Sequence, residues 1–372
     1  MSTSQALEFV NLIVEKGVRM CAGVPDSLLG ALSLELDKNE LIRHVKAPHE
    51  GLALSTAAGF QLATRDRALV YLQNSGLGNL VNPYLSLMHE RVYDLPILMM
   101  IGWRGEDPEA DEPQHRAQGQ KTLQMLRSMD IEIVKLDSET DITSAVNQAI
   151  RILDQGRSVA ILASKGTMGA ASISAGDSLK PERKEWLREI QSAICHDSVV
   201  VSTTGKTSRE LFELQSEQER KRTFYCIGGM GHVSSIATGF ALGKPETKVV
   251  CIDGDGALQM HAGSLFMVGA SKPRNLIHVL INNGVHESVG GQDVSNPTVD
   301  YVALSLLAGY STAKELVAIE DLQREISSMQ KAPGPHFLVC QTSPYSSGKL
   351  GRPVGSPKEW VNDFISTIIS DG

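Results

Sequence analysis

The stretch Lys248-Val-Val-Cys-Ile-Asp-Gly-Asp-Gly256 joins an apolar, β-branched run to a glycine-rich turn around Asp255. A second apolar run, Leu276-Ile-His-Val-Leu-Ile-Asn-Asn283, ends in two amide side chains. Both runs have the composition of buried strands, and residues 257–270 between them predict a crossover helix. The spacing therefore predicts one βαβ unit in which Asp255 and Asn283 follow neighbouring parallel strands.

This unit predicts a metal and phosphate site. Carboxylate and amide oxygens suit a hard divalent cation such as Mg²⁺, which keeps phosphate oxygens as further ligands. Gly254 and Gly256 allow a phosphate to approach the backbone closely, and the amino end of the following helix favours its negative charge. The alternative interpretation is two ordinary turns after two strands.

Length and charge limit the class of protein. A chain of 372 residues is long enough for two domains of typical size. Its formal net charge of −8 argues against a nucleic-acid-binding surface, which usually needs a basic patch. An anionic substrate must then be attracted by a few local cations and by the metal.

The sequence also predicts a cellular location. The five cysteines show no CxxC spacing, and Cys251 and Cys340 lie inside apolar runs, so we expect buried thiols in a reducing compartment. The first residues lack the pattern of a secretory signal, and no apolar run approaches the ~20 residues of a membrane span. We therefore expect a soluble, cytoplasmic protein with no membrane partner.

Strand-like and helical segments alternate along the chain, which predicts an α/β fold of two doubly wound parallel-sheet domains. The predicted strands are residues 41–45, 68–73, 96–101, 132–136, 158–163, 198–202, 248–252, 277–281 and 336–341, and helical patterns include 4–16 and 51–64. Residues 166–184 are polar and lack an apolar period, so we expect them to link domain 1–165 to domain 185–372.

Glu50 is a candidate catalytic carboxylate. It lies in Ala47-Pro-His-Glu-Gly51, between the predicted strand 41–45 and a helix of small residues. A carboxylate beside such a tightly packed helix should be poorly solvated, which suits proton exchange with a bound ring. The alternative is an acidic residue favoured by the helix dipole.

Two other loops have the composition of cofactor contacts. In Cys226-Ile-Gly-Gly-Met-Gly-His232, glycines around Met230 permit close approach of a ligand, and the Gly228 carbonyl can accept a hydrogen bond. A lone Met is otherwise usually core. Thr204 lies in a small polar loop before Thr207-Ser-Arg-Glu210, which predicts a capping box. This loop fits a phosphate contact and an ordinary helix start equally well.

With these residues placed, the chain resembles the thiamine-diphosphate-dependent 2-oxoacid decarboxylases, and within them the phosphonopyruvate and sulfopyruvate decarboxylases. The resemblance covers nearly the whole chain. It is carried by Gly23-Val-Pro-Asp-Ser27, Gln73-Asn-Ser-Gly-Leu-Gly-Asn79, Ile101-Gly-Trp-Arg-Gly105, Asp111-Glu-Pro-Gln-His115, Gly228-Gly-Met-Gly-His232 and Asn282-Asn-Gly-Val-His-Glu-Ser-Val-Gly-Gly-Gln292.

The resemblance implies a pyrimidine-binding first domain, a diphosphate-binding second domain, and thiamine diphosphate with Mg²⁺ as cofactors. Asp255 and Asn283 would bind Mg²⁺ through their side chains and Val285 through its carbonyl. Glu50 would activate the cofactor, with Met230 as a wedge. The active site would lie at the interface of a homodimer or larger homo-oligomer.

The implied reaction is decarboxylation of 3-phosphonopyruvate to phosphonoacetaldehyde and carbon dioxide, a step of phosphonate and phosphonate-antibiotic biosynthesis. The candidates for the proton donor are His286, His115 and Glu287, of which His115 is expected on a loop. Arg104 offers a planar fork for the phosphonate, unless it pairs with Glu106 or Asp107. Further residues expected to line the substrate site are Asp26, Ser27, Asn74, Ser75 and Glu287.

Four alternatives remain at this point. The first is that the substrate is sulfopyruvate, since phosphonate and sulfonate groups have similar tetrahedral shapes. The second is a thiamine-dependent carboligase, and the third is a regulatory, non-catalytic member of the fold. A plain dinucleotide-binding protein is the fourth, but its GxGxxG sequence after an early strand is missing.

Overall fold

The structure is a computed structural model that describes residues 4–109, 111–169, 178–345, 350–351 and 355–370. Internal contacts divide the chain into two units, residues 1–174 with 288–295 and residues 175–287 with 296–372. Residues 170–177 of the predicted connector lie outside the described residues. The last two residues of the connector, 183 and 184, already belong to helix α7 (Arg183–Ala193). The domain boundaries drawn from the sequence stay a prediction.

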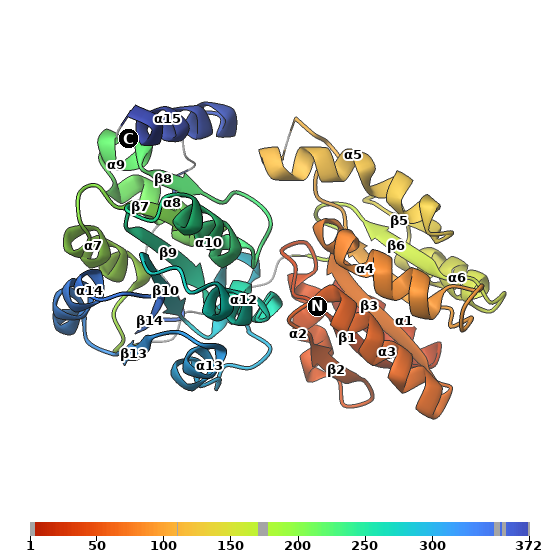
Figure 1. Cartoon of the computed structure of the whole chain (residues 1–372). Coiled ribbons are helices and arrows are strands. Elements are labelled where there is room, and N and C mark those ends of the chain that lie inside the picture. Colours follow the sequence, from red (N-terminus) through yellow and green to blue (C-terminus); the bar gives the residue numbers. More distant parts are fainter. Residues whose placement is uncertain (1–3, 110, 170–177, 346–349, 352–354, 371–372) are drawn as a thin grey trace. The chain divides into compact units, whose positions relative to one another are not determined.

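The first unit is built on a six-stranded parallel sheet with the order β2-β1-β3-β4-β6-β5 (Figure 1). Its strands are β1 (Val18–Gly23), β2 (Arg43–Lys46), β3 (Arg67–Gln73), β4 (Leu98–Gly102), β5 (Glu132–Leu136) and β6 (Val159–Ala163). The central strands are buried on both faces, because their side chains contribute alternately to two apolar cores.

Helices cover both faces of this sheet. One face is covered by α1 (Gln5–Glu15), α2 (Gly30–Lys38) and α6 (Ile142–Leu153), and the other by α3 (Glu50–Thr64), α4 (Leu77–Pro83) and α5 (Pro113–Ser128). Helix α6 illustrates the cause: its buried residues recur at helical spacing from Ile142 to Leu153, and the Asp141 side chain caps its first turn. Short turns η1 (Asn74–Gly76) and η2 (Tyr84–Met88) flank α4.

The second unit also contains a six-stranded parallel sheet, with the order β13-β14-β10-β9-β7-β8. Its strands are β7 (Val199–Ser202), β8 (Thr223–Tyr225), β9 (Val249–Gly254), β10 (Leu276–Asn282), β13 (Thr312–Leu316) and β14 (His336–Gln341). Numbered from one to six within its own unit, each sheet has the strand order 2-1-3-4-6-5. The two units are therefore topological copies.

Two helical layers cover this second sheet. Helices α7, α8 (Lys206–Leu214) and α14 (Leu322–Lys331) pack on one face, and α10 (Val233–Gly243), α12 (Ser264–Ser271), α13 (Tyr301–Ala308) and α15 (Pro357–Ser370) on the other. The remaining short elements are α9 (Glu217–Lys221), α11 (Asp255–Met260), β11 (Val285–His286), η3 (Glu287–Val289), β12 (Gln292–Asp293) and η4 (Ile319–Asp321).

The predicted α/β fold with parallel sheets is confirmed, and β5 and β14 begin and end where the sequence predicts. The prediction of a single crossover helix over residues 257–270 is wrong. The chain forms α11 and α12 instead, because His261 leaves the helical region at φ −131° and ψ 48° and Gly263 precedes α12. Cys251 and Cys340 are buried free thiols, as predicted. Among the described residues, no helix has the length and apolarity needed to cross a bilayer.

Candidate active site

Predicted site residues of the first unit follow the carboxyl ends of four neighbouring strands. Strand β2 leads to Glu50, β1 to Asp26 and Ser27, β3 to Asn74 and Ser75, and β4 to Arg104. Because these strands are parallel, all six residues come to one edge of the sheet. Ligands of open α/β sheets bind at this edge.

Glu50 is held firmly at the first position of α3. Its side chain is 4% exposed, and its Oε2 accepts a hydrogen bond from Asn79 Nδ2 at 2.7 Å. The preceding His49 caps the helix through its ring, which accepts from the Gly51 N–H at 3.0 Å. Gly76 packs so closely that a Cβ there would lie 2.2 Å from Glu50 Oε1. The carboxylate therefore has a defined place and poor access to water.

Asp26 is a second buried carboxyl group at the same edge. Its oxygens accept hydrogen bonds from Gln73 Nε2 at 2.6 Å and from the Leu28 N–H at 3.1 Å. Burial raises the pKa of Asp26 above its usual value, although these hydrogen bonds oppose the shift. A perturbed carboxyl group at the ligand edge of a sheet is a candidate for proton exchange or substrate contact.

Arg104 pairs with Asp111, and neither of the predicted alternatives, Glu106 and Asp107, is that partner. Arg104 Nε lies 2.8 Å from Asp111 Oδ2, its Nη2 contacts Oδ1, and its Nη1 donates to Ser27 Oγ at 3.2 Å. Despite burial, the Arg104 guanidinium and two backbone N–H groups hold the pKa of Asp111 well below its usual range. The fork of Arg104 is thus engaged within its own unit.

Asn74 joins the ends of β3 and β4. Its side chain exchanges two hydrogen bonds with the backbone of Arg104, at 2.8 and 3.0 Å, and is 3% exposed. Ser75 is exposed and donates to Gln73 Oε1 at 2.7 Å. Asn74 therefore fixes the loop that carries Arg104, whereas Ser75 is open to a ligand.

His115 is not on a loop as predicted. It lies in the first turn of α5, which starts at Pro113, a residue favoured at that position. The ring is half-buried, and its Nδ1 is buried without a hydrogen-bond partner among the described residues. Burial and the nearby Arg104 lower the pKa of His115, so the imidazole is neutral at pH 7.

In the second unit, the predicted cofactor residues also follow the carboxyl ends of adjacent strands. Thr204 follows β7, Gly228 and Met230 follow β8, Asp255 follows β9, and Asn283 follows β10. The chain turns to opposite sides of the sheet after its first and third strands, β7 and β9, which makes this point the usual place for a ligand.

Asp255 and Asn283 are brought together as the βαβ unit predicts. Asp255 is 3% exposed, and its Oδ2 accepts from the N–H of Gly284, the residue after Asn283, at 2.6 Å. Its Oδ1 accepts from the Gly256 N–H at 2.9 Å. Asn283 Oδ1 accepts from the Val285 N–H at 3.3 Å. Burial raises the pKa of Asp255 to about 6.

The glycines of this edge leave room for a ligand. Gly228 is exposed and Met230 is half-buried between Gly229 and Gly231, which have φ of 70° and 85°. A Cβ at Gly254 would meet no atom closer than Thr203 Cγ2 at 4.0 Å. The loop can therefore approach phosphate oxygens through its backbone.

The capping box predicted at Thr207–Glu210 does not form. Helix α8 starts at Lys206 after Gly205, which has φ 84° and no side-chain cap. Glu210 instead accepts two hydrogen bonds from Arg183, both at 2.8 Å. A buried guanidinium needs a carboxylate partner more than the helix needs a cap, since an unpaired buried charge is costly.

Glu287 has two cationic partners. Its Oε2 accepts from Arg183 Nη1 and its Oε1 from Lys206 Nζ, both at 2.7 Å. His286 is half-buried in β11, directly before it. Sequence reasoning missed Lys206, Asn79 and Asp111, although Lys206 directly follows the predicted phosphate loop.

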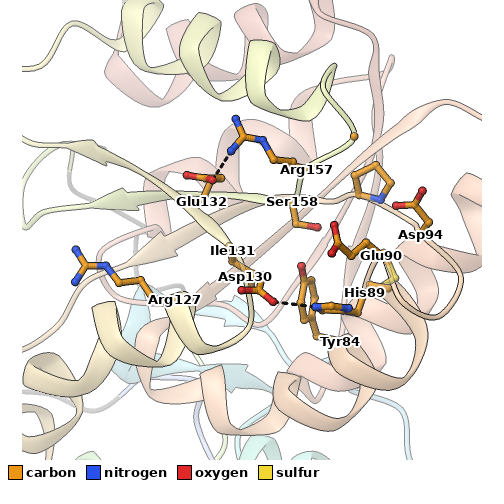
Figure 2. A pocket seen from close by; sticks show the side chains of 13 residues that line it. Tyr84, His89, Glu90, Asp94, Arg127, Asp130, Ile131, Glu132, Arg157 and Ser158 are labelled. Carbon is orange, nitrogen blue, oxygen red and sulfur yellow. Dashed lines mark hydrogen bonds and ion pairs between the residues drawn. The ribbon is translucent and has the colours of Figure 1, made fainter.

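A pocket of about 390 Å³ lies elsewhere in the first unit. It is at the opposite edge of the sheet, where β4, β5 and β6 begin, beside Pro96, Glu132 and Ser158. Figure 2 shows Arg157 next to Glu132 and His89 next to Asp130 in this pocket. None of the predicted site residues lines it.

Comparisons with known proteins agree with this arrangement. Residues 4–131 match the family model of the thiamine pyrophosphate enzyme N-terminal TPP binding domain, and residues 203–340 match that of the C-terminal TPP binding domain. Thiamine pyrophosphate is another name for thiamine diphosphate.

Relatives that align with nearly the whole chain identify the family within this class of enzymes. The chain is 33% identical to a phosphonopyruvate decarboxylase of Streptomyces viridochromogenes, over 98% of this chain and 94% of that protein. It is 32% identical to a phosphonopyruvate decarboxylase of Streptomyces hygroscopicus, over 94% and 90%. It is 26% identical to a sulfopyruvate decarboxylase of Methanosarcina acetivorans, over 96% of both chains. The chain therefore belongs to the thiamine pyrophosphate enzymes and, within them, to the family of the phosphonopyruvate and sulfopyruvate decarboxylases.

Proposed function

We propose that the protein catalyses the decarboxylation of 3-phosphonopyruvate to phosphonoacetaldehyde and carbon dioxide, with thiamine diphosphate and Mg²⁺. The observation that carries the proposal is the similarity to two phosphonopyruvate decarboxylases over almost the whole chain. The same similarity supports a role in phosphonate biosynthesis.

The residues of the second unit fit the diphosphate end of this cofactor. Asp255 and Asn283 supply side-chain oxygens and Val285 a carbonyl for Mg²⁺, and Thr204, Gly254 and Gly256 lie where diphosphate oxygens would be. Among the described residues, no group of three or more His, Cys, Asp or Glu side chains is placed to hold a metal. A site with one carboxylate suits Mg²⁺, which shares its coordination with phosphates.

The residues of the first unit and of the β8 loop fit the pyrimidine end. The buried Glu50 carboxylate would hold a proton against a nitrogen of the aminopyrimidine ring. The Gly228 carbonyl would accept the ring's amino group, and Met230 would support the bent shape of the cofactor. When bound, thiamine diphosphate would supply a carbon nucleophile for the keto group and an acceptor for the electron pair that carbon dioxide leaves behind.

The protein's other task is to bind the substrate and deliver a proton to the carbon that lost carbon dioxide. His115 and His286 are the proposed donors, with Glu287 as the third candidate. His115 would donate from its protonated form, which its lowered pKa makes a stronger acid. Asp26, Ser27, Asn74, Ser75 and Arg104 are the proposed substrate contacts. Because Arg104 is already engaged by Asp111, its role would be to shape the site and, by its charge, to attract an anion.

We further propose a homodimer, or a larger homo-oligomer, in which the first unit of one chain and the second unit of another complete each site. Neighbouring helices α10, α12 and α13 expose large apolar side chains, with Phe266 58% and Leu307 84% exposed. Exposed apolar groups of this size typically mark protein interfaces. The free, mostly buried cysteines are compatible with a cytoplasmic location.

The test is carbon dioxide release from 3-phosphonopyruvate and from 3-sulfopyruvate, with both cofactors added. A higher kcat/KM for 3-phosphonopyruvate is expected. A preference for 3-sulfopyruvate would move the protein to the sister activity, which the relative from Methanosarcina acetivorans favours as a second candidate. Product formed only with an added aldehyde would indicate a carboligase.

The Glu50→Gln variant is the matched control for this assay. Glutamine keeps the shape of the side chain but cannot accept and release a proton as a carboxylate does. Turnover should fall by roughly 100-fold or more, while calorimetry detects unchanged cofactor binding. Wild-type turnover in this variant would remove Glu50 from the mechanism.

A further inference from the structure

Four charged side chains of the second unit form a continuous network that ends at Lys206. Arg183 donates to both oxygens of Glu210 at 2.8 Å and to Glu287 Oε2 at 2.7 Å. Lys206 Nζ donates to Glu287 Oε1 at 2.7 Å. The side chains of Arg183, Glu210 and Glu287 are 6%, 1% and 5% exposed, whereas that of Lys206 is 34% exposed.

The ammonium group of Lys206 has spare donor capacity. It carries three N–H donors, and among the described residues Glu287 is its one hydrogen-bond partner. Glu287 in turn is fixed by the buried Arg183, so it holds the ammonium in place without using all of its donors. A partly exposed, positioned ammonium with two further donors is suited to bind an anion.

Lys206 also stands where an anion is expected. It begins α8 directly after the Thr203-Thr204-Gly205 loop, at the carboxyl end of β7, and β7 is the neighbour of β9, which leads to Asp255. The principal cation of the first unit's edge is less available. The guanidinium of Arg104 gives Nε and Nη2 to Asp111 and Nη1 to Ser27.

We propose that Lys206 binds the acidic group on carbon 3 of the substrate, and that Glu287 positions Lys206 for this contact. The inference rests on the proposed decarboxylase function. Coulomb attraction doubles from a monoanion to a dianion at the same distance, so this contact favours a phosphonate over a sulfonate. In a chain with a net charge of −8, such a local cation helps to attract a dianion.

Steady-state kinetics of the loaded enzyme test the contact. In Lys206→Ala, KM for 3-phosphonopyruvate should rise by roughly 10- to 100-fold, the cost of one charge-assisted hydrogen bond, with a smaller change in kcat. Lys206→Arg should recover much of the loss because it keeps the charge. Lys331→Ala is the control: Lys331 is an exposed lysine at the end of α14, shortly before β14 begins, at the opposite edge of the sheet.

A binding measurement separates this inference from the proposed reaction. Phosphonoacetate carries a phosphonate and a carboxylate but no keto group, so calorimetry on the cofactor-loaded protein reports binding without turnover. Wild-type protein should bind it at least tenfold more tightly than Lys206→Ala. If wild-type protein binds it through Lys206 yet decarboxylates neither 2-oxoacid, the proposed function fails and the Lys206 site stands.

Two results would overturn the inference. One is equal phosphonoacetate binding, or no binding, in wild type and Lys206→Ala. The other is an unchanged KM together with a weakened Kd for thiamine diphosphate, which would assign Lys206 to the cofactor's diphosphate. Glu287→Gln tests the positioning role: it should raise KM for 3-phosphonopyruvate and leave the Kd for thiamine diphosphate unchanged.

Discussion

At the scale of single residues, the carboxyl edge of each sheet holds a buried carboxylate whose charge is not fully neutralised by a cationic side chain. Asp255 is enclosed and its partners are backbone N–H groups, so desolvation dominates and raises its pKa to about 6. Desolvation also raises the pKa of Asp26, at the edge of the first unit. Asp111, by contrast, has a guanidinium partner and a lowered pKa. Buried carboxylates with a raised pKa, such as Asp255 and Asp26, favour binding of a cation or a proton.

The raised pKa of Asp255 predicts a pH dependence of stability in the metal-free protein. Protonated Asp255 contributes stability that is fully present below the ordinary pKa of 3.8 and is lost as the pH rises through about 6. Asp255→Asn lacks this titration. Without metal it should be more stable than wild type above pH 6, by on the order of 1–3 kcal/mol, and the difference should disappear near pH 4.

Urea unfolding of both metal-free proteins between pH 4 and 8 measures this effect. Adding thiamine diphosphate and Mg²⁺ should stabilise the wild type and leave Asp255→Asn nearly unchanged, since the variant lacks the proposed carboxylate ligand of the metal. A stability difference that is constant over the whole pH range would contradict the assigned pKa.

At the scale of elements, the place of Glu50 depends on a close approach between two helical segments. Gly76 ends η1 and faces the first turn of α3, where a Cβ would come within 2.2 Å of Oε1 and 2.4 Å of the carboxyl carbon. Gly78, in the first turn of α4, would place its Cβ in open space. Close packing therefore excludes a side chain at Gly76, whereas no neighbouring atom excludes one at Gly78.

A pair of alanine variants tests this close approach. Gly76→Ala should displace the Glu50 carboxylate and lower kcat by at least about tenfold, because catalytic geometry tolerates shifts of well under 1 Å. Gly78→Ala should retain wild-type turnover, and alanine is the better helix former there. Circular dichroism should detect the same fold in both. Equal turnover in the two variants would mean that Gly76 does not set the position of Glu50.

At the scale of the whole molecule, the chain consists of two units with the same order of parallel strands. Each unit brings its predicted site residues to the carboxyl edge of its sheet: carboxylates and polar side chains in the first, and the proposed metal and phosphate ligands in the second. A cofactor with a pyrimidine end and a diphosphate end needs both sets. The exposed apolar side chains of α10, α12 and α13 offer a surface for a second copy.

Complementation between two inactive variants tests the proposed shared site. In a dimer of one Glu50→Gln chain and one Asp255→Ala chain, one site would carry both changes and the other neither. The purified mixed dimer, isolated through two different tags, should therefore recover about half of the wild-type activity. Each variant alone should be inactive. A mixed dimer without activity would place each complete site within a single chain.

The sequence by itself determined the kind of fold and which polar residues follow the carboxyl ends of its strands. Apolar, β-branched runs ending in glycine-rich turns are local signals, and they predicted the parallel strands, the pairing of Asp255 with the region of Asn283, and Glu50 at a helix start. These predictions need only the chain's own periodicity and the rule that parallel strands bring their carboxyl ends to one edge. The catalytic roles of these residues stay predictions.

Only the tertiary structure decided which distant charges meet. Lys206 and Glu287 are far apart in sequence, and Arg183 reaches both Glu210 and Glu287, so no local pattern indicates the network. Tertiary packing also decided that Arg104 pairs with Asp111 and that His115 lies in a helix. It likewise decided that the two units share one strand order. A buried charge takes whichever partner the packing of separate elements brings within reach, and that packing is a property of the whole fold.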